Sequence, residues 1–172
     1  MSDQTLGTTG RWLQSKFKNI YESSSPEESD FRTQVSFVFH KDVEIFHNHQ
    51  KVTLGTFQDS LSQANFAQSR ASIEWKEVFE VPPAEGETES SIVAGSFVVT
   101  RSMKFRIRAG PAQRLSHNIF SVKIEQDKSI PADDEGSQFR ITHMFITSVE
   151  KAAPIHMAQM HLPGIAKTDP EP

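Results

Sequence analysis

The sequence predicts an α+β fold, with helices packed on one face of a mostly antiparallel sheet. Two observations lead to this prediction. Up to about residue 68 most apolar residues recur at helical spacing, and beyond it they alternate with polar residues up to about residue 149. The length of 172 residues also suits one domain, because chains usually divide only beyond roughly 250 residues. Helices covering one face of a strongly curved sheet would leave a concavity between the two layers.

Three helices are expected from this spacing. The first covers residues 10–22, and its apolar residues share one face. The second covers residues 26–38, where Ser25 suits the cap and a proline suits the first turn. The third follows Thr53, whose hydroxyl can cap a helix, and ends near residue 68.

Five strands are expected from alternating apolar residues. One is short, at residues 43–48, and four are long, at residues 72–81, 91–108, 113–125 and 137–149. Turn-rich segments join the four long strands as hairpins would, which predicts antiparallel pairing. In each strand one row of side chains is expected to face the helices.

The two ends of the chain differ from this central part. Residues 1–9 are expected to be disordered, residues 10–151 to form the domain, and residues 152–172 to be an extended or loosely docked tail. The sequence shows neither a secretory signal nor the roughly 18 consecutive apolar residues of a membrane span. A cytoplasmic protein that does not bind membranes is therefore expected.

The composition excludes several classes of function. There is no cysteine, which excludes disulfide scaffolds, thiol catalysis and zinc sites built on thiolates. Arg101, Lys104, Arg106 and Arg108 cluster, but the net charge of -4 opposes nucleic-acid binding. No phosphate-binding glycine loop, dinucleotide fingerprint or GxSxG motif is present, so no cofactor is expected.

The segment FVFHKDVEIFHN, followed by KVTLGTFQDSL, carries a family resemblance. Together with the order of elements over residues 10–150, it resembles the nuclear-transport-factor-2-like superfamily. This is the cone-shaped fold of ketosteroid isomerase, scytalone dehydratase and SnoaL-like polyketide cyclases. The resemblance implies an acid–base isomerase, cyclase or dehydratase without metal or organic cofactor, acting on a small apolar, natural-product-like ligand. The alternative that it implies is a non-catalytic module that binds ligands or proteins, because the namesake is a dimeric transport adaptor.

His47 is the first catalytic candidate. Periodicity places it on the inward row of Val43 and Ile45, and alignment with ketosteroid isomerase puts it where that family has its catalytic carboxylate. An imidazole with a pKa of about 6.5 suits general acid or base work near neutrality. The alternative is a partly buried histidine at the mouth of the pocket. His49 would point the same way as His47, but nothing fixes further ligands, and no metal is expected.

Arg101 is the second candidate, because it interrupts an otherwise apolar row between Phe97 and Phe105. A buried guanidinium needs a paired anion. Glu77 is the expected partner if the two strands pair as a hairpin. In the functional interpretation Arg101 polarises a substrate carbonyl or carboxylate. In the structural interpretation it forms an Arg–Glu pair, or a bulge turns it outward.

Three further residues complete the catalytic candidates. His143 shares the row of Phe139 and Ile141, and Asn118 begins a strand where some relatives place a catalytic acid or its partner. Tyr21 is the only tyrosine, and ketosteroid isomerase draws a hydroxyl donor from the same helix. The residues expected to line the ligand pocket are Trp75, Glu77, Phe79, Phe97, Val99, Met103, Phe120 and Phe145.

The opposite face of the sheet is the expected interface of a homodimer. Its candidates are Thr100, Lys104, Arg106, Met144 and Ile146. The two functions differ in one structural respect. An open cone into which both His47 and Arg101 reach would favour the enzyme, whereas a cone filled by Phe and Met side chains would favour the binding module.

Overall fold

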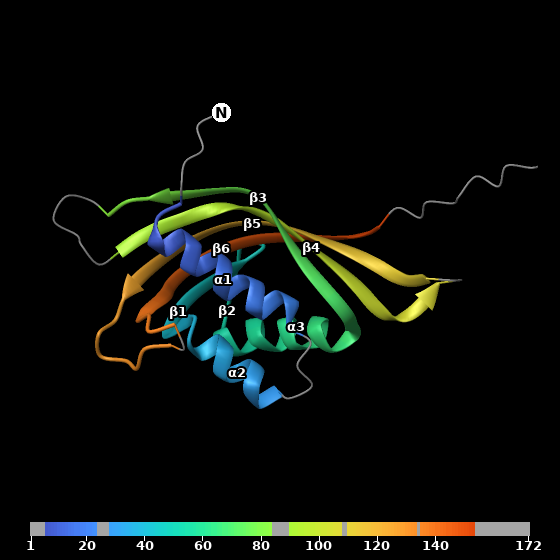
Figure 1. Ribbon diagram of the computed structural model, residues 1–172, viewed down its shortest axis with the longest axis horizontal. Helices are drawn as coiled ribbons and strands as arrows, with labels where there is room; N and C mark the ends of the chain where they lie inside the picture. The colour runs from blue at the N-terminus through green and yellow to red at the C-terminus, as the bar shows by residue number, and fades with distance from the viewer. Residues whose placement is uncertain (1–5, 24–27, 84–89, 108–109, 134, 154–172) are drawn as a thin grey trace, which may run out of the picture.

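The computed structural model describes residues 6–23, 28–83, 90–107, 110–133 and 135–153. Within these ranges the chain forms three helices and six strands, which confirms the α+β fold (Figure 1). In chain order they are α1 (Thr8–Glu22), α2 (Glu28–Ser36), β1 (Phe39–His47), β2 (Gln50–Val52), α3 (Leu54–Ala67), β3 (Gln68–Val81), β4 (Ser90–Ile107), β5 (Gly110–Gln126) and β6 (Phe139–Ala152).

The helices form where expected, with small shifts at their ends. Thr53 caps α3 through its hydroxyl, which accepts a hydrogen bond of 3.1 Å from the backbone N–H of Thr56. Helix α1 begins at Thr8, two residues before the predicted boundary. Residues 1–5 and 154–172 lie outside the described residues. No helix in the part that the structure describes is long and apolar enough to cross a membrane.

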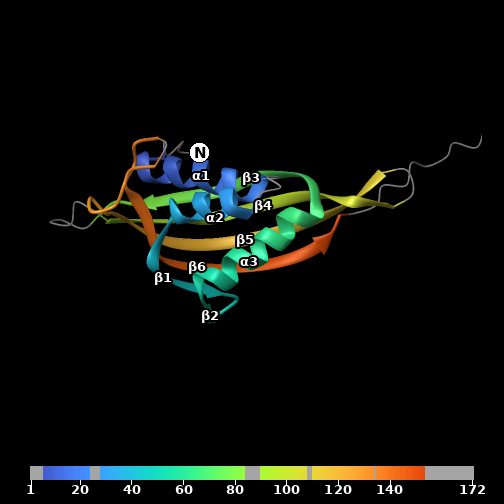
Figure 2. The same cartoon turned by 90° about the horizontal axis from the view of Figure 1, so that it is seen from below.

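The sheet has the strand order β2-β1-β6-β5-β4-β3. All neighbours are antiparallel except β1 and β6, which run parallel. The three helices lie on one side of the curved sheet, and the end where β4 meets β5 extends beyond them (Figures 1 and 2). The sheet therefore has an inner face toward the helices and an outer face that the helices leave uncovered.

One extra residue in β3 changes which side chains point inward. Trp75 pairs with Phe97, and Glu77 pairs with the next residue of β4, so Lys76 is the extra residue. Beyond this bulge the alternation is reversed, and Phe79 lies exposed on the outer face with Glu77. The prediction that Glu77 and Phe79 line the interior is therefore wrong.

A second bulge does the same in β6. Lys123 pairs with His143 while Ile124 pairs with Ile141, so Thr142 is the extra residue. Consequently His143 and Phe145 face outward, while Met144 and Ile146 are buried. The sequence prediction had these two pairs on the opposite faces and is wrong for all four residues.

Aromatic side chains fill the space between α1 and the inner face. Their ring centroids lie 5.1 to 6.3 Å apart, mostly with edge-on or tilted planes. The members of this aromatic cluster are Phe17, Tyr21, Trp75, Phe97 and Phe120. The concavity is thus packed with the chain's own side chains at this level.

Candidate functional site

The inner face of the sheet changes from apolar to polar along its strands. Toward one end it carries Val93 and Phe97 on β4, and toward the other end it carries buried polar side chains. We call the latter the polar end. Its buried members are Tyr21 from α1, Asn65 from α3, Gln68 from β3, Arg101 from β4, and Ser116 and Asn118 from β5.

Arg101 is the most unusual member of the polar end. Arg101 is only 6% exposed, and its guanidinium carbon lies 6.0 Å from the centroid of the Tyr21 ring. The Nε has no hydrogen-bond partner, and the guanidinium forms no ion pair within the described ranges. Burial lowers the pKa of Arg101, and the charges of Tyr21 and Glu150 act in the opposite direction.

The predicted partner of Arg101 is wrong. In the sheet register Arg101 lies between Ala71 of β3 and Arg114 of β5. Glu77 lies further along β3, opposite Ser96, and its side chain is exposed. Burial of Arg101, in contrast, agrees with the alternation predicted for this part of β4.

Tyr21 supplies a phenol beside Arg101. Burial raises its pKa well above the usual value, and the nearby charge of Arg101 offsets part of this effect. The group therefore stays protonated and can donate its O–H. The end of α1 is held by two side chains, because Asn65 donates to the carbonyl of Ile20 at 3.0 Å and Gln68 donates to that of Ser23 at 3.2 Å.

Asn118 is buried and fully partnered. Its amide donates to the carbonyl of Ser116 at 2.9 Å, and its oxygen accepts a hydrogen bond of 2.7 Å from the Ser148 hydroxyl. In the sheet it lies opposite Phe97, whose ring is 5.2 Å from that of Tyr21. Of the predicted candidates, the structure therefore brings Tyr21 and Arg101 together, whereas Asn118 lies about 13 Å along β5 from the position opposite Arg101.

His47 lies elsewhere on the same face. As predicted, it points toward the helices, where its ring packs edge-on at 6.4 Å from that of Phe57. Strand β1, however, is separated from β4 by β6 and β5. Across these strands His47 is level with Phe120, whereas Arg101 is level with Arg114, about 20 Å further along β5. The two residues do not share a site.

His143 does not join them either, because it lies on the outer face. Its Nε2 is 3.7 Å from a carboxylate oxygen of Glu44. Among the described side chains no three His, Asp or Glu groups come together as a metal site requires. His49, the other half of the histidine pair, is exposed in the turn after β1.

The residues expected to line a ligand pocket divide into two groups. Phe97, Val99 and Phe120 are buried inside the packed core, with Trp75 and Met103 half-buried beside it. The remaining three, Glu77, Phe79 and Phe145, are exposed on the outer face. The residues of the first group pack against one another in the core.

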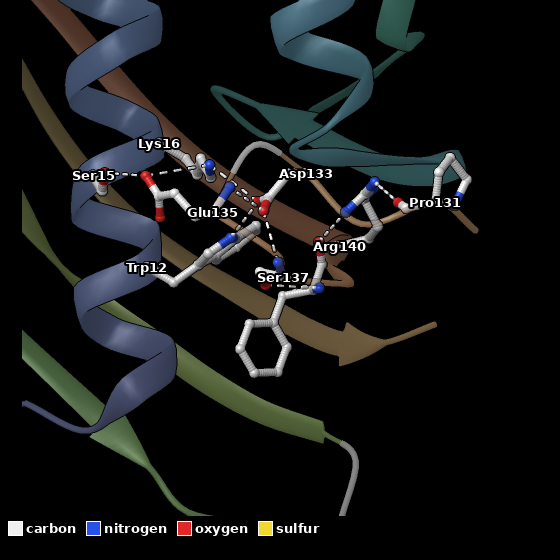
Figure 3. A network of polar contacts seen from close by, with 9 residues as sticks. Trp12, Ser15, Lys16, Pro131, Asp133, Glu135, Ser137 and Arg140 are labelled. Carbon is white, nitrogen blue, oxygen red and sulfur yellow. Dashed lines mark hydrogen bonds and ion pairs between the residues drawn. The ribbon is translucent and has the colours of Figure 1, made fainter. Parts of the chain in front are cut away.

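At the opposite end from Arg101, a buried carboxylate joins α1 to the loop between β5 and β6. Asp133 accepts hydrogen bonds from the Trp12 indole at 3.2 Å and the Ser137 backbone N–H at 2.7 Å, and its oxygen lies 3.0 Å from the Lys16 ammonium (Figure 3). We call this the Asp133 clasp. Burial acts to raise the pKa of Asp133, but the bonds from Ser137, Lys16 and Trp12 together hold it below its usual value.

The outer face of the sheet carries a second candidate surface. Six large apolar side chains on it are 42 to 67% exposed, and we call them the outer apolar face: Phe79, Val81, Ile92, Ile119, Phe145 and Val149. The ring of Phe145 stacks on that of Phe46 of β1 at 4.8 Å. Several large exposed apolar side chains on one face mark a binding site more often than a single one does. The alternation of apolar residues would have predicted the outer apolar face if the sequence had revealed the two bulges.

Comparison with solved structures identifies the fold. Candida albicans Mtr2 is 14% identical, with 86% of this chain and 96% of that chain aligned at a TM-score of 0.57. A scytalone dehydratase-like protein from Novosphingobium aromaticivorans is 9% identical over 87% and 91% of the two chains, also at 0.57. The hexachlorocyclohexane dehydrochlorinase LinA, type 2, is 9% identical over 90% and 94%, at 0.56. The chain therefore has the nuclear-transport-factor-2-like cone fold.

These neighbours thus include a scytalone dehydratase-like protein and a dehydrochlorinase as well as Mtr2. No protein-family model matches the chain, and no curated protein matches its sequence. At such low sequence identities the structural similarity defines only the fold. The function has to be inferred from the residues of this chain.

Proposed function

We propose that this protein is a non-catalytic binding module that pairs through the outer apolar face with a second domain of the same fold, and specifically with a second copy of this chain. The observation that carries the proposal is the exposure of six large apolar side chains on the sheet face opposite the three described helices. Burying such a face is favourable at roughly 25 cal/mol per Å² of apolar surface.

One row across the sheet suits a twofold contact. It runs from Phe79 on β3 through Ala94 and Ser121 to Phe145 and Phe46. Large side chains thus stand at both ends of the row, with small ones between them. In a twofold interface the same patch meets itself, so Phe79 of one copy can face Phe145 of the other, while the small residues allow close approach.

The interior also favours binding over catalysis. The aromatic cluster fills the concavity, and His47 and Arg101 lie at different levels of different strands. An acid–base enzyme would need these groups to act on one ligand. Among the structural neighbours, Candida albicans Mtr2 has also been solved in complex with the Mex67 M domain, and that structure aligns with 86% of this chain at 14% identity and a TM-score of 0.55.

The test is the mass of the protein in solution. We expect light scattering after size exclusion to give about twice 19.4 kDa for the full chain at micromolar concentration. Ile119→Glu places a charge at the most exposed position of the outer apolar face and should give a folded monomer with an unchanged far-ultraviolet circular dichroism spectrum.

Phe66→Glu is the matched control, because Phe66 on α3 is 76% exposed and lies on the helical side of the molecule. This variant should remain a dimer. A wild-type protein that stays monomeric at 100-fold higher concentration would refute pairing between copies, as would equal dimerisation of the Ile119→Glu variant.

A further inference from the structure

We propose that Arg101 anchors a binding site for a small monocarboxylate at the polar end of the inner face. The site is separate from the outer apolar face and does not depend on dimerisation. It rests on a buried guanidinium to which the described residues supply no anion, with the ring of Tyr21 beside it.

A second buried arginine shows what this chain does with a structural guanidinium. Arg140 is 3% exposed, and it donates to the carbonyls of Phe139 at 2.7 Å and Pro131 at 3.2 Å. Both arginines lie near an aromatic ring, Arg140 at 5.7 Å from Phe37 and Arg101 at 6.0 Å from Tyr21. Ring contact is thus common to both, and only Arg101 lacks acceptors from the described chain.

The polar end holds a second unpartnered atom. The Oε1 of Gln68 is buried without a hydrogen bond, although the amide nitrogen of the same side chain is bound to carbonyls at the end of α1. In the sheet Gln68 lies opposite Met103, two positions beyond Arg101 on β4. Buried polar atoms are rarely left unpaired. This atom is an acceptor, and a carboxylate has no donor to offer it, so the proposed site rests on Arg101 and Tyr21.

The donors present determine the class of ligand. Arg101 brings one positive charge in a planar fork that matches a carboxylate, and the protonated Tyr21 brings a neutral O–H. One positive charge balances a monoanion and not a phosphate dianion. The aromatic rings of Phe17 and Phe97 fill the space beneath, so the ligand must be small.

The charged groups beside Arg101 are exposed. Arg114, which lies opposite Arg101 on β5, is 3.5 Å from Glu150, and both side chains are more than half exposed. Because Glu150 is held by Arg114, it leaves the guanidinium of Arg101 without a contact ion pair.

The experiment follows the Nε–H resonance of Arg101 by NMR, identified through its loss in Arg101→Met. Wild-type protein is titrated with propionate at constant ionic strength, and with propionamide and inorganic phosphate as matched neutral and dianionic probes. We expect a saturable shift and a rise in melting temperature with propionate only. Tyr21→Phe should weaken propionate binding several-fold, and Arg101→Met at least tenfold.

Arg32→Met is the control, because it removes an exposed guanidinium from α2, where Arg32 pairs with Asp59 of α3, and it should leave propionate binding unchanged. The proposal is overturned if wild-type protein shows no saturable response to propionate. Equal responses to propionate and propionamide, or tighter binding of phosphate, overturn it as well. These wild-type comparisons decide the matter even if Arg101→Met does not fold.

Discussion

The two ends of the inner layer treat buried charge in opposite ways. At the clasp, the Asp133 carboxylate meets Lys16, Trp12 and backbone N–H groups, so that charge and hydrogen bonds are both satisfied. At the polar end, Arg101 is buried with an unpartnered Nε and no described counter-ion. Burial alone therefore does not give a charged side chain a structural role. A buried charge that the fold completes by itself stabilises the fold, whereas one left incomplete is available for a ligand.

The largest expected effect is at the clasp. Asp133→Asn keeps the shape of the side chain but leaves the buried Lys16 ammonium without its main counter-ion. Removing one partner of a buried ion pair costs about 3–5 kcal/mol, so the melting temperature should fall by about 10 °C.

Glu135→Gln is the control, because Glu135 also contacts Lys16, at 3.5 Å, but is half exposed. It should lower the unfolding free energy by less than about 1 kcal/mol. If both variants lost a similar amount of unfolding free energy, the buried Asp133 would not differ from the half-exposed Glu135 as a partner of Lys16.

The two buried arginines provide the second prediction. Arg140→Met leaves the carbonyls of Phe139 and Pro131 without donors, and should lower the unfolding free energy by about 1–3 kcal/mol in urea titrations. Arg101→Met removes an unpaired buried charge, so the unfolding free energy should be unchanged or rise by about 1 kcal/mol. If Arg101→Met is instead the more destabilised of the two, Arg101 is a structural residue and the contrast between the two ends is lost.

The sequence predicts some of this arrangement because alternation determines the face of a residue as long as a strand is unbroken. Arg101 was therefore placed correctly on the inner face. Phe145 was placed on the wrong face, because one extra residue at Thr142 reverses the alternation, as Lys76 does in β3. Nothing in the local pattern marks either bulge. The clasp was missed for another reason, since Asp133 binds α1 across more than 100 positions of the chain.

The smallest effect concerns pH and affects only one of the two ends. The pKa of Asp133 is lower in the folded protein than the value of about 3.9 expected for the unfolded chain. Its contribution to stability is therefore complete above that value and is lost as the pH falls through the folded pKa. The difference in unfolding free energy between wild type and Asp133→Asn should be constant from pH 7 to about pH 5. Below pH 4 it should shrink by at most about 1.4 kcal/mol per pH unit.

The difference between wild type and Arg101→Met should stay flat over the same range, because a guanidinium keeps its charge there. Urea titrations at a series of pH values measure the difference in unfolding free energy between wild type and each of the two variants. A clasp variant whose deficit persisted at the lowest pH would show that Asp133 acts through its shape and hydrogen bonds, and that the two ends differ in packing instead of charge. If both differences in unfolding free energy changed with pH by the same slope, the contrast between the two ends would be wrong, because Arg101 has no carboxylate in contact with it that acid could protonate.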